Sequence, residues 1–127
     1  MATVHQLIST DKAPAALGPY SQAVVANGFI FCSGSVGINP TTGAVADGVK
    51  NQTLQVFANL RAILTAANSS FSKVVKTTVF LKDMNDFAVV NEIYQEQMGG
   101  ALPARACIEA ARLPKDVLVE MECIATV

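Results

Sequence analysis

The segment 117–127 constrains the fold most, because apolar side chains occupy every second position in it. These alternate residues are Val117, Val119, Met121, Cys123 and Ala125. Side chains of a β-strand alternate between the two faces of a sheet. We therefore predict a strand whose first face lies beneath helices, while its second face carries Glu120 and Glu122 beside aliphatic residues.

The remaining sequence predicts two helices and five further strands. The strands are expected at 3–8, 23–26, 29–33, 73–82 and 104–111, and the helices at 49–67 and from Asn85 or Asp86 to Met98. Asn27-Gly28 between the second and third strands is the strongest short hairpin signal. The order β-β-β-α-β-α-β-β predicts an α+β fold with one mixed sheet and two helices packed on one face. Residues 1–127 then form a single domain, whose other sheet face meets water or another subunit.

Composition narrows the class of protein. The chain has 127 residues with 9 Lys+Arg against 10 Asp+Glu, and the basic residues are scattered, which weighs against nucleic acid as a partner. No stretch approaches the roughly 18 consecutive apolar residues of a membrane span. The first twelve residues resemble neither a secretory signal nor a transit peptide, so we expect a cytoplasmic protein, with a mitochondrial location as the alternative. A mean hydropathy of +0.38 suggests that some apolar surface meets another subunit.

The cysteines and the single histidine predict neither a disulfide framework nor a metal site. Cys32, Cys107 and Cys123 form no CxxC motif, and His5 is the one histidine in the sequence. No cofactor is expected.

Arg105 is the strongest single candidate for a functional residue. Its planar guanidinium can bind a carboxylate through two hydrogen bonds. Strand alternation puts Arg105, Cys107 and Glu109 on one face, which we assign to the helix-free face together with Glu120 and Glu122. Glu120 could move a proton or hold a water if burial raises its pKa. The alternatives are that Arg105 pairs with Glu109 or Glu120, and that these charges form surface ion pairs of about 0 to 1 kcal/mol each.

Three further candidates carry weaker signals. Tyr20 lies in a Gly-Pro-Tyr-Ser turn that suits the wall of a pocket, although simple loop packing is the alternative. Ser33-Gly34-Ser35 follows an apolar strand and could offer backbone N–H groups to an anion. Cys107 could be a nucleophile, but no histidine is placed to activate it, so a small buried thiol is the better expectation.

Motifs that resemble those of one protein family are spread over essentially the whole chain. They lie at 13–23, 33–34, 39–40, 75–81, 87–94, 103–109, 112–114 and 119–122, and the sixth reads Pro103-Ala104-Arg105-Ala106-Cys107-Ile108-Glu109. In residue type and spacing they resemble the Rid/YjgF family, the reactive intermediate deaminases, also called the endoribonuclease L-PSP family. The sequence departs from this pattern at Ser35, where many relatives have Gln, so the shape of this loop and the substrate preference stay open.

The resemblance implies a chorismate-mutase-like fold, assembled as a homotrimer with ligand clefts between subunits. It also implies hydrolysis of 2-imino acids, such as 2-iminobutanoate and 2-iminopropanoate, to 2-oxo acids and ammonia. These imines arise from enamines that PLP enzymes release. The implied catalytic residues are Arg105, which grips the substrate carboxylate, and Glu120, which positions or activates the attacking water. The implied substrate-binding residues are Tyr20, Ser33, Gly34, Asn91, Arg105 and Cys107.

Three functions other than imine hydrolysis are alternatives for this sequence. A ribonuclease or translation inhibitor is one, and the missing basic patch weighs against it. A non-catalytic trimer that binds small ligands, or that acts like a chaperone, could use the same clefts, and the sequence does not separate it from an enzyme. A chorismate mutase rests on the shared fold alone.

Overall fold

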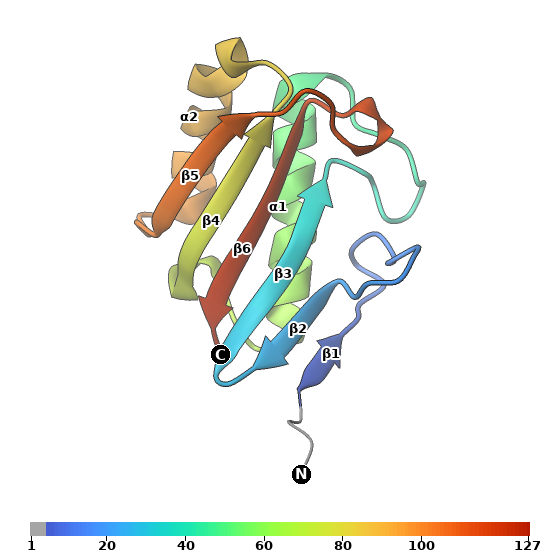
Figure 1. The fold of residues 1–127 in the computed structure, drawn as a ribbon, viewed down its shortest axis with the longest axis vertical. Helices are drawn as coiled ribbons and strands as arrows, with labels where there is room; N and C mark the ends of the chain where they lie inside the picture. The colour runs from blue at the N-terminus through green and yellow to red at the C-terminus, as the bar shows by residue number, and fades with distance from the viewer. Residues whose placement is uncertain (1–4) are drawn as a thin grey trace.

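The computed structural model describes residues 5–127, and in this part of the chain six strands form one mixed sheet that two helices cover on one face (Figure 1). The strands are β1 (Gln6–Ile8), β2 (Ala23–Ala26), β3 (Phe29–Val36), β4 (Val74–Leu81), β5 (Ala104–Glu109) and β6 (Val119–Thr126). The helices are α1 (Gly48–Ala66) and α2 (Phe87–Met98). The predicted α+β architecture is confirmed.

The strands follow the order β1-β2-β3-β6-β4-β5, so that the last strand in sequence lies in the middle of the sheet. β6 is antiparallel to both of its neighbours, β3 and β4. β4 and β5 are parallel, because α2 carries the chain back across the sheet between them. The expected hairpin joins β2 to β3, with Asn27 and Gly28 both at positive φ.

The element ends differ from the predicted ones by a few residues. Residues 3–4 of the first expected strand lie outside the described residues. β3 runs on to Val36, beyond an irregular pairing with β6 between Cys32 and Ser35. β5 stops at Glu109 and β6 starts at Val119, because residues 114–116 form a short 3-10 turn.

Asp86, one of the two expected caps, occupies the N-cap position of α2, but its side chain makes no capping hydrogen bond. The side-chain cap lies one element earlier, where Asp83 accepts a hydrogen bond from the Asn85 N–H at 2.9 Å at the 3-10 turn that precedes the helix. At the other end, Gly99 adopts the left-handed conformation, with a φ of 61°, that ends helices.

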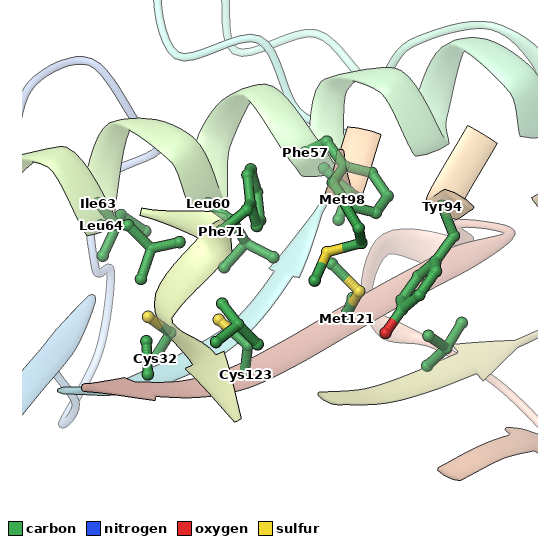
Figure 2. Packing of buried hydrophobic residues seen from close by; sticks show 14 of the residues in the cluster. Cys32, Phe57, Leu60, Ile63, Leu64, Phe71, Tyr94, Met98, Met121 and Cys123 are labelled. Atoms are coloured by element: carbon green, nitrogen blue, oxygen red, sulfur yellow. The ribbon is translucent and has the colours of Figure 1, made fainter. Parts of the chain in front are cut away.

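The apolar face of β6 is buried beneath the helices, as predicted. Its buried residues are Val119, Met121, Cys123 and Ala125. Figure 2 shows Met121 and Cys123 pointing from the sheet toward Phe57 and Leu60 of α1. Full burial of a valine or methionine side chain, as at Val119 and Met121, stabilises a fold by about 1.5 to 3 kcal/mol. This core fixes which face of β6 is left for function, namely the face with Glu120.

Helix α1 buries Phe57, Leu60 and Leu64, which recur at helical spacing, but Leu54 at the same spacing is 45% exposed. Two polar residues of the helix, Gln52 and Asn59, are buried as well. Gln52 accepts a hydrogen bond from the Leu118 N–H at 2.8 Å, and Asn59 donates to the carbonyl oxygen of Val36 at 3.1 Å. These amide side chains satisfy backbone groups at strand ends, so their burial carries no unmet polar atom. No helix in the described part of the chain has the length and apolar character that a membrane crossing requires.

Candidate functional site

Arg105 projects from β5 toward α2 and is held there by three α2 side chains. Its Nη1 donates a hydrogen bond to Asn91 Oδ1 at 2.7 Å. Its guanidinium carbon lies 4.8 Å from the ring centre of Tyr94 and 5.6 Å from that of Phe87. Phe87, Asn91 and Tyr94 are spaced by four and three residues, so they share one face of the helix. The Tyr94 hydroxyl is in turn hydrogen bonded to Thr77 Oγ1 of β4 at 2.8 Å.

A groove of about 340 Å³ opens beside this guanidinium. It is lined by Asn91, Tyr94, Gln95, Arg105 and residues 100–103. Among residues 5–127 one ion pair is found, and it joins Arg112 to Asp116. Arg105 therefore has no carboxylate partner within this part of the chain. Since a guanidinium carries five N–H groups, Arg105 retains donors for an anion in the groove.

The prediction that Arg105, Cys107 and Glu109 lie on the helix-free face is wrong. β5 pairs with β4 in a register that puts Arg105 beside Thr77 and Cys107 beside Val79. Thr77 and Val79 are buried beneath the helices. Residues that are directly paired across two strands share a face of the sheet. The side chains of Arg105, Cys107 and Glu109 therefore also point to the helix side.

Glu120 lies on the opposite, helix-free face, over the backbone of Gly34. A Cβ atom at position 34 would lie 2.9 Å from the carboxyl carbon of Glu120 and would overlap one carboxylate oxygen. Gly34 belongs to the irregular part of β3, between Cys32 and Ser35, where β3 has one residue more than β6. Such bulges redirect side chains and often lie beside functional sites. Position 34 therefore requires glycine, because the side chain of Glu120 occupies the space that a Cβ atom would need.

The surroundings of Glu120 favour its protonated form. Burial raises the pKa of Glu120 above its ordinary value, and the negative charge of Glu122 raises it further. A carboxyl group with a raised pKa exchanges protons closer to neutral pH than an exposed one. The pKa shift therefore suits proton transfer at Glu120.

Ser33 of β3 is hydrogen bonded to the end of the loop that carries Tyr20. The Ser33 hydroxyl donates a hydrogen bond to the Ser21 carbonyl at 2.6 Å, and the Ser33 N–H donates to the Gln22 carbonyl at 3.0 Å. The Tyr20 side chain is 57% exposed, and its own N–H donates to the Gly18 carbonyl at 2.9 Å. Tyr20 is thus presented on a loop whose end is bound to β3.

Cys107 is a half-buried thiol beside Arg105. Burial raises its pKa, and the positive charge of Arg105 only partly opposes this effect. The thiol form therefore prevails at neutral pH, which disfavours a nucleophilic role. Cys32 and Cys123 are directly paired across β3 and β6, and a hydrogen bond from Cys32, together with burial, raises the pKa of Cys123. Within residues 5–127 no three potential metal ligands come together.

The predicted site residues thus form two groups on opposite sides of the sheet. The helix-side group holds Asn91, Arg105 and Cys107, and the bulge-side group holds Tyr20, Ser33, Gly34 and Glu120. Sequence reasoning missed Phe87 and Tyr94 as neighbours of Arg105, although their spacing from Asn91 was a usable signal. It also missed Gln22, which lies in a loop without periodicity.

The chain thus combines a single mixed sheet, which both helices cover on one side, with candidate site residues on both faces of the sheet. The family model described as endoribonuclease L-PSP matches residues 10–127. The chain belongs to this family, and its resemblance to the Rid proteins is confirmed.

Relatives with described activities and solved structures agree with this assignment. The 2-iminobutanoate/2-iminopropanoate deaminase of Mus musculus is 52% identical over 123 residues, which cover 96% of this chain and 91% of that protein. The structure of YyfA from Yersinia pestis, of the conserved Rid protein family, has a TM-score of 0.95 at 43% identity and covers 98% of this chain and 100% of its own. Escherichia coli TdcF with bound serine has a TM-score of 0.91 at 40% identity, covering 96% and 98%.

Proposed function

We propose that this protein hydrolyses small 2-imino acids, 2-iminobutanoate and 2-iminopropanoate, to the corresponding 2-oxo acids and ammonia. The observation that carries the proposal is the Arg105 guanidinium, which is stacked on Tyr94, bound to Asn91 and left without a carboxylate partner beside an open groove. The name of the mouse relative, a deaminase of these two imines, supports the same substrate class.

Arg105 would bind the carboxylate that every 2-imino acid carries. Its contacts with Asn91 and the two aromatic rings fix the plane of the guanidinium before substrate arrives. A fixed plane favours two parallel N–H to oxygen bonds, which orient the bound acid as well as attract it. The serine bound to TdcF is a small molecule with the same carboxylate group.

Glu120 would accept and donate protons during the hydrolysis. A water molecule adds to the carbon of the protonated imine and gives up one proton to the Glu120 carboxylate, which leaves a carbinolamine. Glu120 then returns this proton to nitrogen and the C–N bond breaks. As the carbonyl forms, the Glu120 carboxylate takes the hydroxyl proton and passes it to the departing ammonia. The balance is one protonated imine and one water consumed for one 2-oxo acid and one ammonium ion. The raised pKa of Glu120 suits both transfers.

Ser33 would face the nitrogen end of the substrate. Its hydroxyl has one proton, which it donates to the Ser21 carbonyl. Toward a ligand, this oxygen can therefore act as an acceptor. An acceptor at this place suits the N–H groups of an iminium ion and is unsuited to a carboxylate.

A second copy of the chain would unite the two groups of site residues. Arg105 lies on the helix side and Glu120 on the open side of the same sheet, so a small acid cannot touch both within one chain. We therefore place the site between subunits of a homotrimer, where the α2–β5 side of one protomer meets the bulge side of the next.

The open face of the sheet supports this assembly, and its mass is a testable consequence. Leu7, Val24, Phe31 and Ile124 are successive partners across four strands and form an apolar row on this face. Phe31 is 45% exposed in the single chain. Light scattering should give three times 13.3 kDa, about 40 kDa. A monomer mass at micromolar concentration would contradict the shared site.

Imine hydrolysis can be measured directly. A PLP-dependent threonine or serine dehydratase is allowed to release enamine, and ammonia and 2-oxo acid are followed with and without this protein. We expect the conversion of imine to accelerate in proportion to the amount of protein added. An unchanged rate with correctly assembled protein would leave a trimer that only binds small acids as the better account.

Replacing Cys107 should have little effect on this activity. The Cys107→Ser variant keeps the backbone groups of β5 and removes a thiol that burial holds in its protonated form. We expect most of kcat/KM to remain, measured on variants of wild-type mass. A loss beyond about a hundredfold would indicate covalent chemistry at the sulfur.

A further inference from the structure

Gln22 has more hydrogen bonds through its side chain than any proposed site residue has. The two N–H groups of its side chain amide are shared among three carbonyl oxygens, those of Thr10 at 3.0 Å, Ala13 at 3.3 Å and Pro14 at 2.8 Å. Its amide oxygen accepts a hydrogen bond from the Thr10 N–H at 2.7 Å. The residue is 5% exposed. A buried amide with these four contacts fixes the start of the loop against the first residues of β2.

The loop that Gln22 holds leads directly to Tyr20. Among the described residues, the segment 11–20 makes one hydrogen bond between its own backbone groups, from the Tyr20 N–H to the Gly18 carbonyl. The loop therefore depends on its anchors. One anchor is the Gln22 side chain, and the other is the Ser33 hydroxyl on the Ser21 carbonyl.

Gln22 also connects the loop to the bulge of β3. Its carbonyl oxygen accepts the Ser33 N–H at 3.0 Å, one residue before Gly34. The same residue thus contacts the loop through its side chain and β3 through its backbone. A shift of Gln22 would move Tyr20 relative to Ser33 and Gly34.

We infer that Gln22 is a positioning residue, which acts through Tyr20 and holds it at the distance from the β3 bulge that imine hydrolysis needs. The inference rests on the proposed function, in which Tyr20 lines the substrate cleft. Glutamine suits this place because one side chain must donate to carbonyls and accept from an N–H together.

The position of Tyr20 can be followed without any enzymatic assay. Tyr20 and Tyr94 are the two tyrosines of the sequence, so protein labelled with fluorotyrosine gives two fluorine resonances. Gln22→Met keeps the size of the side chain and removes all four hydrogen bonds. We expect the Tyr20 resonance to shift or broaden, while the Tyr94 resonance, from α2, stays in place. Ser69→Ala is the control, since it removes one partly buried hydrogen bond, to the Thr126 carbonyl at the end of β6 and outside this loop, and it should move neither signal.

A double-mutant cycle separates positioning from general loss of stability. Gln22→Met should lower kcat/KM about tenfold in the native background, because a misplaced contact weakens the reaction. In a Tyr20→Ala background, the same change should lower it by less than about twofold, since the group it positions is gone. Equal losses in both backgrounds would overturn the inference.

The outcomes also distinguish a failure of the inference from a failure of the proposed function. If Tyr20→Ala leaves imine hydrolysis intact, the role of Tyr20 in the cleft is wrong, and the fluorine signals still report whether Gln22 holds the loop. Should Gln22→Met not fold, Gln22→Glu retains the acceptor for the Thr10 N–H and loses the donor. An unchanged Tyr20 resonance in a folded variant would refute the positioning role.

Discussion

Replacing Arg105 with alanine should lower kcat/KM for imine hydrolysis by about a thousandfold, because a charge-assisted pair of hydrogen bonds to the substrate carboxylate can contribute several kcal/mol and each 1.4 kcal/mol is about tenfold in rate. Arg105→Lys should be almost as severe. Lysine keeps the positive charge but has no planar fork to stack on Tyr94 and to bond Asn91 and substrate together.

Arg61 offers a matched control for this substitution. Its guanidinium lies 5.1 Å from the ring centre of Phe71 and donates a hydrogen bond to Gln97 Oε1 at 3.1 Å, so it makes the same kinds of contact outside the proposed site. Arg61→Ala should cost similar stability and leave kcat/KM unchanged. Near wild-type kcat/KM in folded Arg105→Ala trimers would refute the carboxylate-binding role.

Glu120→Gln should make the protein more stable at neutral pH and much less active. Burial raises the pKa of Glu120 in the folded chain, so the folded state binds this proton more tightly than the unfolded state does. Stability therefore falls as the pH rises from the ordinary glutamate value through the raised one, and the loss persists at neutral pH. The variant should have a higher Tm than the wild type at pH 7, and the difference should vanish well below about pH 4.3.

The same variant tests the catalytic role of the carboxylate. Turnover should fall more than the affinity for a 2-oxo acid such as 2-oxobutanoate, because the proposed role of Glu120 concerns the water. Wild-type activity should decline as the pH falls through the raised pKa of Glu120. Glu96→Gln removes an exposed charge from α2 and should change neither Tm nor turnover. Unaltered kcat in Glu120→Gln would show that another group moves the proton.

Mixing the two inactive variants tests whether the site is shared between subunits. A Glu120→Gln chain still has Arg105, and an Arg105→Ala chain still has Glu120. A cleft that takes Arg105 from the first chain and Glu120 from the second is therefore intact. Random assembly of equal amounts into rings leaves about one quarter of the clefts intact. Co-refolded mixtures should therefore recover about a quarter of wild-type activity per chain. No recovery in mixed trimers would place each site within one chain.

The alternation in segment 117–127 was enough to predict the buried face of β6, because period-two patterns depend on backbone geometry alone. The same alternation in β5 grouped Arg105 with Cys107 correctly but assigned them to the wrong side. The side is set by the register of β5 with β4, which pairs Arg105 with the buried Thr77 and Cys107 with the buried Val79. A local pattern contains no information of that kind.

Buried polar residues were the least predictable part of the chain. Gln52, Asn59 and Gln22 look like surface residues in sequence, yet each is buried because it completes hydrogen bonds of distant backbone. Their partners lie up to 66 residues away in sequence. Side-chain chemistry indicated carboxylate binding for Arg105 and proton transfer for Glu120, and the family resemblance implied the same roles. The structure adds which residues surround each of them.

The central place of β6 has a consequence for how the chain folds as it is made. β3 and β4 are separated in the sheet by a strand that the ribosome synthesises after both. Until residues 119–126 have left the exit tunnel, each of these strands has an open edge that can pair with another nascent chain. Many of the contacts that complete the sheet join residues far apart in sequence, which slows folding. We therefore expect chains stalled before this segment to be the ones that chaperones must protect.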